Sequence, residues 1–374
     1  MTLAQELDAL PTRLRHRLAE RGFDPQQLVG WAADLHRGKD ERNRLRGRVE
    51  PVGHDHIITA PTPEDPGFAD LHQRGAAAVA AGELAICVLA GGMATRMGGV
   101  VKALVEVTGG RTFLDLRLAE QQRLAHTLGR PVPLWLMTSE PTDGPIRAAL
   151  GARRDGQRIA TFQQFVSLRL SPEGRLWRDD GGQPSVYATG HGDLPDALLA
   201  AGLLQQFVAG GGRYVWISNL DNLGASVDLA LLGQHVESGA ALTVELVDKH
   251  PGDRGGGPVR HDGKPIIAED FRVPLGFDVD QVPVFNTNTF LVSAQRLAAL
   301  DLRWTYVEVH KQVAGRGAVQ FERLLGELTE AIEPRFLRVP RTGVATRFLP
   351  MKSREDLDSS RELIEQVAAR LGVD

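Results

Sequence analysis

From about Gly82 onward, short apolar runs alternate with segments of helical periodicity, and this alternation constrains the fold more than any other feature. Strands that alternate with helices form a mostly parallel sheet with helices on both faces, so we expect an α/β fold. The Asp262-Gly263 pair predicts a tight hairpin, which adds a small antiparallel element. The expected strands are LAICVLA, VPLWLMTS, RIATFQQ, RYVWISNL and ALTVELVDK, and the expected helices are TFLDLRLAEQQRLAHTLG, PIRAALGARR, LPDALLAAGLLQQFVAGG and SVDLALLGQHVESG.

The two ends of the chain differ from this central pattern. The first 50 residues have helical character, and the prolines and glycines of VGHDHIITAPTPEDPG (residues 52–67) predict a connector. The last segment, SREDLDSSRELIEQVAARLGVD, reads as an amphipathic helix with Ser353 as its N-cap. We therefore divide the chain into a helical region and linker (1–80), a central domain (81–345) and a C-terminal segment (346–374).

Composition limits the classes of partner. The chain has 43 Lys and Arg residues against 47 Asp and Glu residues, and its net charge of -4 argues against a general nucleic-acid binder. It has no apolar run of signal-peptide or membrane-spanning length. The single cysteine, Cys87, lies in an apolar run, where we expect it to pack as a small core residue. These features predict a cytoplasmic protein without a nucleic-acid or membrane partner.

The loop LAGGMATRMGGVVKAL (residues 89–104) follows the first strand of the central domain, and its glycines indicate phosphate binding. It lacks the Lys-Ser/Thr pair that closes a P-loop. It also lacks the middle glycine of the dinucleotide fingerprint, and β-branched residues follow it where that fingerprint needs a helix. The remaining interpretation is a loop whose backbone N–H groups approach a base and triphosphate, followed by Lys102, which neutralises phosphate charge.

This loop resembles the signature L-x-G-G-x-G-T-x-M-G of sugar-1-phosphate nucleotidyltransferases. Further segments are similar, in the same order, to those of eukaryotic-type UTP–glucose-1-phosphate uridylyltransferases, and the resemblance covers about residues 85–357. It implies a Rossmann-like GT-A-type nucleotidyltransferase fold. It also implies that a nucleoside triphosphate, UTP in this family, reacts with glucose-1-phosphate to give UDP-glucose and pyrophosphate. The segments are TFQQ, YATGHGDLPDAL, SNLDNLGASVD, the predicted hairpin, VFNTNTFLVS and RFLPMKSREDL.

The resemblance also implies a role for each matching residue. Lys102 and Lys352 would contact the phosphates, and Asp221 would hold Mg²⁺, so these three form the predicted catalytic group. Both substrates are polyanions, so the reaction requires positive charge and positioning rather than a protein nucleophile. The implied nucleotide-binding residues are Leu89, Ala90, Gly91, Gly92, Arg96, Lys102, Gln164, Gly190 and Asp221, and the implied sugar-phosphate-binding residues are His191, Asn219, Gly257, Glu269, Asn286, Asn288 and Lys352.

Plainer structural interpretations stand beside several of these roles. Asp221 could cap the helix that begins near Ser226, although other residues there can fill that role. Arg96 could be an ordinary exposed arginine, and His191 a satisfied buried histidine. Asp248 is a weaker metal candidate, which can simply end its strand.

The sequence departs from the family pattern in ways that leave the substrates open. Ala94 stands where the signature has glycine, TGHGD lacks two prolines, and the residues around Lys102 and after Gln164 differ. Another base, or a glucose-like amino-sugar or cyclitol phosphate, therefore remains an alternative within the same chemistry. A non-catalytic nucleotide-sugar-binding protein is an alternative from another class.

Two further expectations concern related proteins. A GT-A glycosyltransferase would need a D-x-D metal motif, and Asp278-Val-Asp280 is a poor candidate because its context is loop-like. The chain also ends where the family continues into a left-handed β-helix used in assembly. An oligomer is therefore possible but is not predicted.

Overall fold

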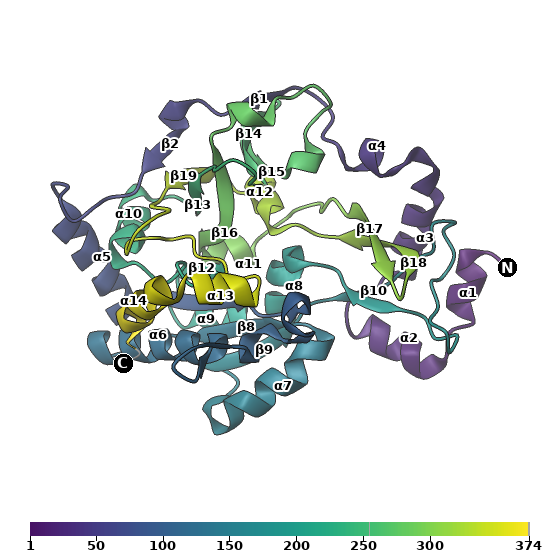
Figure 1. Cartoon of the computed structure of the whole chain (residues 1–374), viewed down its shortest axis with the longest axis horizontal. Coiled ribbons are helices and arrows are strands. Elements are labelled where there is room, and N and C mark those ends of the chain that lie inside the picture. The colour runs from purple at the N-terminus through teal and green to yellow at the C-terminus, as the bar shows by residue number, and fades with distance from the viewer. Residues whose placement is uncertain (254, 373–374) are drawn as a thin grey trace.

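The computed structural model describes residues 1–253 and 255–372, and its centre is an eight-stranded mixed sheet (Figure 1). Among these described strands, seven run parallel to one another, and β16 runs antiparallel to both of its neighbours. The predicted mostly parallel α/β sheet is therefore confirmed. Across the sheet the order is β2 (Ile57–Thr59), β19 (Pro334–Arg338), β13 (Leu242–Asp248), β16 (Val284–Ser293), β12 (Tyr214–Asn219), β3 (Leu84–Leu89), β8 (Leu134–Thr138) and β9 (Ile159–Gln163).

Alternate side chains of β3 divide the core into two layers, because successive residues of a strand point to opposite faces. Leu84, Ile86 and Val88 pack in one layer, and Ala85 and Cys87 pack in the other. Cys87 is fully buried, as expected. The first layer contains α5 (Phe68–Ala80), α6 (Phe113–Leu128), α7 (Glu140–Leu150), α10 (Leu229–Ser238) and α14 (Arg361–Leu371), and the second contains α8 (Leu194–Ala200), α9 (Leu203–Ala209), α11 (Ala294–Ala298) and α12 (Leu328–Ala331).

Two expectations for local structure are wrong. Residues 52–67, expected to form a connector, contribute β2, which pairs in parallel with β19. The β-branched pair Ile57 and Ile58 favours a strand despite the prolines nearby. Residues 194–211, expected to form one helix, contain α8 and α9 because Gly202 adopts a left-handed φ of 72° between them.

The C-terminal segment also forms two helices rather than the single helix expected. Ser353 caps α13 (Arg354–Ser359) as predicted, since its hydroxyl accepts a hydrogen bond from the N–H of Asp356. This helix ends at Ser359, and α14 then packs in the same core layer as α6. Residues 373–374, the end of the predicted tail helix, lie outside the described residues.

Small antiparallel elements surround the main sheet. The predicted hairpin forms, with Asp262 and Gly263 at φ values of 46° and 85°, as a type I′ turn requires. Two further pairs, β10–β11 and β17–β18, are not predicted by the sequence patterns above. The bounds of these elements are β1 (Val49–Pro51) with β14 (Gly257–His261) and β15 (Lys264–Ala268), β10 (Val166–Leu168) with β11 (Val186–Ala188), β17 (Val307–Val313) with β18 (Arg316–Glu322), β4 (Met93–Ala94) with β5 (Val100–Val101), and β6 (Glu106–Thr108) with β7 (Arg111–Thr112).

The first 50 residues contain four short helices, as expected. These helices pack against the β10–β11 and β17–β18 pairs. Leu18 and Leu28 are fully buried there together with Leu168 and Phe321. Figure 1 shows these helices beside β10, β17 and β18, at the end of the molecule away from α14. No helix within the described residues has the length and apolar composition needed to cross a membrane. The four helices are α1 (Leu3–Asp8), α2 (Thr12–Ala19), α3 (Pro25–Ala33) and α4 (Lys39–Asn43).

His235 makes the stability of this core sensitive to acid. It lies on α10, its Nδ1 is 2.8 Å from Thr243 Oγ1, and burial lowers its pKa from 6.5 to about 4. The folded protein favours the neutral ring, whereas the unfolded chain takes up a proton on this ring below about pH 6.5. The free energy of unfolding therefore decreases as pH falls from 6.5 toward 4. We expect a loss of about 3 kcal/mol over that range. In urea unfolding at pH 7 and pH 5, a His235→Gln variant should lose less stability than the natural protein, and an equal loss would contradict this assignment.

Candidate functional site

The carboxyl ends of β3, β8, β9 and β12 lie at one edge of the sheet, where a cavity of about 730 Å³ opens, here called the large cavity. The strands are parallel, with Leu89 paired to Asn219 and Thr138 paired to Gln163, so the loops that follow them begin side by side. Ligands of open α/β sheets bind at such an edge. Among the predicted nucleotide-binding residues, Leu89, Gly91, Gly92, Lys102, Gln164, Gly190 and Asp221 line this cavity.

Gly91 lies directly against Gln164 in the wall of the large cavity. A Cβ atom at position 91 would be 2.5 Å from Gln164 Oε1, so a larger residue there would displace the amide group of Gln164 from its present position. The backbone N–H of Gln164 donates to the carbonyl of Thr138 at 2.8 Å, and Gln164 is 8% exposed. The loop and the amide side chain therefore form one continuous wall.

Two loop residues predicted to bind nucleotide lie elsewhere. Ala90 is buried and Arg96 is exposed, and neither is among the described residues that line the large cavity. Ala94, which replaces the signature glycine, has a φ of −80°. Because alanine adopts this backbone conformation without strain, the replacement requires no change in the path of the loop.

Lys102 and Asp221 meet in the large cavity, where Lys102 Nζ lies 2.5 Å from Asp221 Oδ2. The two side chains are 14% and 22% exposed, so their charges are only partly screened by water. The backbone N–H of Lys102 donates to the carbonyl of Gly92 at 3.2 Å, which links the lysine to the glycine loop. Asp228, rather than Asp221, caps α10 by accepting two N–H groups of its first turn. The capping interpretation of Asp221 is therefore wrong.

Arg117 on α6 supports the loop that carries Asp221, and sequence reasoning missed it. Its guanidinium, 2% exposed, donates to the carbonyls of Asn219 and Asn222 at 3.1 and 2.7 Å. Glu120 lies 3.0 Å from this guanidinium and accepts the N–H of Val227 at 2.6 Å. A buried ion pair thus holds both ends of the loop, and only its i, i+3 spacing on a helix could have signalled it.

Asn222 joins the Asp221 loop to the C-terminal segment that carries the second predicted lysine. Its Nδ2 donates to the carbonyl of Arg347 at 3.1 Å, and its Oδ1 accepts the N–H of Leu349 at 2.8 Å. The carbonyl of Asp221 also accepts the N–H of Met351 at 3.0 Å. Two segments about 130 residues apart in sequence are thereby fixed side by side.

Replacing Asn222 with alanine is expected to lower activity as well as stability. The change leaves the buried N–H of Leu349 without its partner, which costs about 2 kcal/mol of unfolding free energy, and it loosens the segment behind Lys352. We expect kcat to fall by about tenfold or more. Asn43→Ala is the matched control, because Asn43 makes the same double contact with the backbone of Glu308, and neither residue lines either cavity. Urea unfolding should show that both variants are destabilised, and steady-state kinetics should show that only Asn222→Ala loses kcat. Equal kcat values in the two variants would contradict the role of Asn222.

A second cavity of about 230 Å³, here called the small cavity, adjoins the large one, since His191, Asn219 and Asp221 line both. Lys352 lines the small cavity, so both predicted lysines and Asp221 belong to one continuous site. Gly255 and Gly256 line it, whereas Gly257 begins β14 and is not among the described lining residues. The other predicted sugar-phosphate residues on this wall are Glu269, Asn286 and Asn288.

Three asparagines of the small cavity are linked by hydrogen bonds. Asn288 Nδ2 donates to Asn219 Oδ1 at 3.0 Å, and the N–H of Asn288 donates to Asn286 Oδ1 at 2.9 Å. Asn288 has a φ of 59°, a left-handed conformation that is uncommon outside glycine and often found at functional sites. The network fixes amide groups on a wall that can bind hydroxyl groups.

Burial tunes two ionisable groups of this site. It lowers the pKa of His191, whose Nδ1 accepts the N–H of Leu325 at 2.9 Å. The ring is therefore neutral with its proton on Nε2, which makes it a hydrogen-bond donor. Burial, with Asp270 nearby, raises the pKa of Glu269. A carboxyl group with a raised pKa can accept or donate a hydrogen bond at a sugar hydroxyl.

The lining of the large cavity also includes polar residues that no sequence motif indicated. They lie on β17, on β18 and directly after β10, so only the tertiary structure brings them to the site. Lys311 pairs with Glu322 at 2.8 Å, and Arg169 donates to Gln320 at 3.0 Å. These polar side chains line the same cavity as the loops of the main sheet.

The weaker metal candidates have structural roles. Asp248 forms an ion pair with Arg338 at 2.7 Å at the end of β13. Asp278 accepts the N–H of Asp280 in a short 3₁₀ helix, so the D-x-D sequence forms a local turn. Among the described residues, no group of three or more His, Cys, Asp or Glu side chains is placed to hold a metal ion.

Comparisons with known proteins show which family the chain resembles. The family model described as UTP–glucose-1-phosphate uridylyltransferase matches residues 44–367. The enzyme of that name from Saccharomyces cerevisiae is 31% identical over 295 residues, which are 74% of this chain and 58% of the yeast protein. The one from Solanum tuberosum is 31% identical over 291 residues, which are 74% of this chain and 60% of the potato protein. The chain spans about three fifths of the length of these relatives.

Solved structures share the fold at lower sequence identity. A UDP-glucose phosphorylase from Trypanosoma brucei superposes with a TM-score of 0.73 at 21% identity, over 95% of this chain and 77% of that one. A UDP-N-acetylglucosamine pyrophosphorylase from the same organism gives a TM-score of 0.74 at 20% identity, over 98% and 80% of the two chains. A mutant UDP-glucose pyrophosphorylase from Leishmania major in complex with UDP-glucose gives 0.70 at 21% identity, over 96% and 78%. The nucleotidyltransferase-type fold expected from the sequence is thereby confirmed.

Proposed function

Because the chain belongs to the UTP–glucose-1-phosphate uridylyltransferase family, we propose that it transfers a uridylyl group from UTP to glucose-1-phosphate and releases pyrophosphate. The observation that carries this proposal is the Lys102–Asp221 pair at the junction of two cavities, with Lys352 on the wall of the second. Two cavities that meet at a charged junction suit a reaction between two phosphorylated molecules. A protein that only bound a nucleotide sugar would not need both lysines there.

The proposed reaction needs positioning and charge. A phosphate oxygen of the sugar phosphate attacks the α-phosphorus of UTP and forms a new P–O bond. The bond from the α-phosphorus to the oxygen that bridges to the β-phosphate breaks, and pyrophosphate leaves with the electron pair. The attacking oxygen is already anionic, so no general base is required. In this scheme Lys102 neutralises the departing pyrophosphate, and Lys352 holds the phosphates of both substrates. His191 is suited to donate from Nε2 to a phosphate or sugar oxygen.

We propose Mg²⁺ as the cofactor and Asp221 as its ligand. A single carboxylate fits this ion, because Mg²⁺ takes one or two protein carboxylates and completes its coordination with substrate phosphates and water. Lys102 contacts Oδ2 of Asp221, which leaves Oδ1 as the candidate ligand atom. The ion would supply further neutralisation of phosphate charge.

The walls of the two cavities support a division of substrates between them. Gln164, against the glycine loop in the large cavity, offers one donor and one acceptor, which suits the edge of a uracil base. The linked amides of Asn219 and Asn288, with Glu269, suit the hydroxyl groups of a hexose in the small cavity. We therefore propose the nucleotide in the large cavity and the sugar phosphate in the small one.

Pyrophosphate release with each of four nucleoside triphosphates and a panel of sugar-1-phosphates tests the proposal. We expect the highest kcat/KM with UTP and glucose-1-phosphate, and removal of divalent cations by EDTA should abolish turnover. A preference for another pair would correct the substrates and keep the reaction class. Binding without release for every pair would indicate a nucleotide-sugar-binding protein. Consumption of UDP-glucose without added pyrophosphate would indicate a glycosyltransferase.

A further inference from the structure

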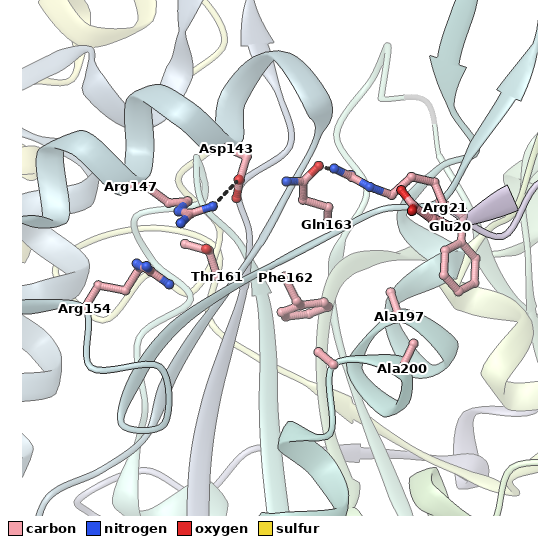
Figure 2. Close-up of a pocket in the computed structure, with 12 residues that line it drawn as sticks. Glu20, Arg21, Asp143, Arg147, Arg154, Thr161, Phe162, Gln163, Ala197 and Ala200 are labelled. Carbon is pink, nitrogen blue, oxygen red and sulfur yellow. Dashed lines mark hydrogen bonds and ion pairs between the residues drawn. The ribbon is translucent and has the colours of Figure 1, made fainter. Parts of the chain in front are cut away.

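A third cavity, of about 290 Å³, lies apart from the proposed catalytic site and contains three arginines (Figure 2). We call it the arginine pocket. It is bounded by the end of α2, by α7 and the turn after it, by β9, and by α8. β9 separates it from the large cavity, since Gln163 lines the arginine pocket and the next residue, Gln164, lines the large cavity. The arginines are Arg21, Arg147 and Arg154.

The three guanidinium groups are held to different degrees. Arg21 donates to the side-chain oxygen of Gln163, and Arg147 lies 3.5 Å from Asp143. Arg154 forms no side-chain hydrogen bond or ion pair with any other residue that the structure describes. Figure 2 shows Arg147 and Arg154 reaching the same end of the pocket beside Thr161. At least one full positive charge therefore remains unbalanced in a concave site.

The two acidic residues of the pocket do not cancel this charge. Asp143 is 6% exposed, and its Oδ1 accepts the hydroxyl hydrogen of Thr138 at 2.8 Å, so it is already occupied on one side and paired with Arg147 on the other. Glu20 is exposed to solvent, where its charge is well screened. The net charge of the lining, three arginines against two acids, is positive.

The pocket has more hydrogen-bond donors than the two oxygens of a carboxylate ligand could use. The guanidinium groups of Arg147 and Arg154, the hydroxyl of Thr161 and the free amide nitrogen of Gln163 surround one space, and Figure 2 shows that nitrogen directed toward Asp143 and Arg147. A phosphate group has enough oxygens to accept from several such donors, and arginine binds it through two parallel hydrogen bonds. We propose that the arginine pocket binds a phosphate group, either as inorganic phosphate or as a small phosphate ester.

The opposite wall leaves room for the ester. Ala197, Ala200 and Ala201 on and after α8, with the ring of Phe162, form an apolar surface on the side of the pocket away from Arg147 and Arg154. An ester with a compact carbon body would place that body on this surface while its phosphate meets the guanidinium groups. Inorganic phosphate would use the charged half of the pocket alone.

Isothermal titration calorimetry tests this site without reference to turnover, and so separately from the proposed reaction. The starting protein is a Lys102→Met/Lys352→Met double variant, in which phosphate binding at the proposed catalytic site is weakened. Inorganic phosphate and glucose 6-phosphate are titrated in parallel arms. We expect saturable binding of one molecule per chain in at least one arm. Tighter binding of the ester would show that the apolar wall contributes.

Adding Arg154→Ser to the double variant should weaken this binding about tenfold or more, since a charge-assisted double contact is removed. Arg13→Ser is the matched control, because it removes an equal charge from an exposed position on α2. Thermal unfolding monitored by circular dichroism confirms that each variant is folded. The proposal is overturned if neither compound binds the double variant below about 10 mM, or if Arg154→Ser and Arg13→Ser have the same effect.

Discussion

A Lys352→Met variant is expected to release pyrophosphate about a thousandfold more slowly than the natural protein at saturating substrate. Lys352 lines the small cavity, and the proposed reaction uses its charge where two phosphorylated molecules meet. Removing one preorganised electrostatic contact in such a site typically costs a factor of a hundred to a thousand in kcat, and these substrates concentrate unusually high negative charge. Steady-state kinetics with UTP and glucose-1-phosphate measure the effect.

The loss in this variant should come from chemistry and not from folding. Lys352 is exposed, so its replacement should change the free energy of unfolding by less than about 0.5 kcal/mol. Arg354→Met, two residues further along and also exposed, removes an equal charge and serves as the control. We expect the control to keep nearly full activity. If Lys352→Met retains activity within about fivefold of the control, the lysine has no part in catalysis.

Local patterns predicted most of the central sheet because the signals were local. β3, β8, β12 and β13 coincide with segments rich in apolar residues, and the Asp262-Gly263 turn has the backbone that its residues favour. The failures came where tertiary pairing decides the structure. β2 has three residues and exists because β19 offers it a partner. β17 and β18 pair with each other and bury Phe321 against the N-terminal helices, a contact that no local pattern shows.

The candidate site shows the same division between local and tertiary information. Family resemblance identified Lys102, Asp221 and Lys352, and the structure brings them to adjoining cavities. Family resemblance did not identify Arg117 or Asn222, which position the two segments that carry Asp221 and Lys352. Both side chains act by hydrogen bonding to backbone carbonyl and N–H groups that are distant in sequence. No local residue pattern indicates such contacts. Resemblance thus located the groups proposed to contact substrate, and coordinates were needed to find what holds them.

Replacing Asp221 with asparagine should lower kcat/KM by about a thousandfold or more. The change removes the negative charge of Asp221 and leaves the positive charge of Lys102 without its partner. The carboxylate lies 2.5 Å from Lys102 Nζ and is the proposed ligand of Mg²⁺. Asparagine keeps the shape of the side chain but cannot balance the lysine, and a neutral amide is a poor ligand for a hard cation. The Mg²⁺ concentration at half-maximal rate should therefore rise together with the loss of rate.

Asp248→Asn distinguishes this role from a general effect of removing an acid at the end of a strand. Asp248 also ends a strand of the sheet, and it pairs with Arg338 outside the two cavities. We expect this variant to retain the Mg²⁺ dependence and nearly all of the activity of the natural protein, since a surface ion pair contributes at most about 1 kcal/mol. Activity measured across a Mg²⁺ titration decides the matter. An unchanged half-maximal concentration in Asp221→Asn would place the metal elsewhere, and a comparable loss in Asp248→Asn would remove the distinction between the two carboxylates on which the proposed site depends.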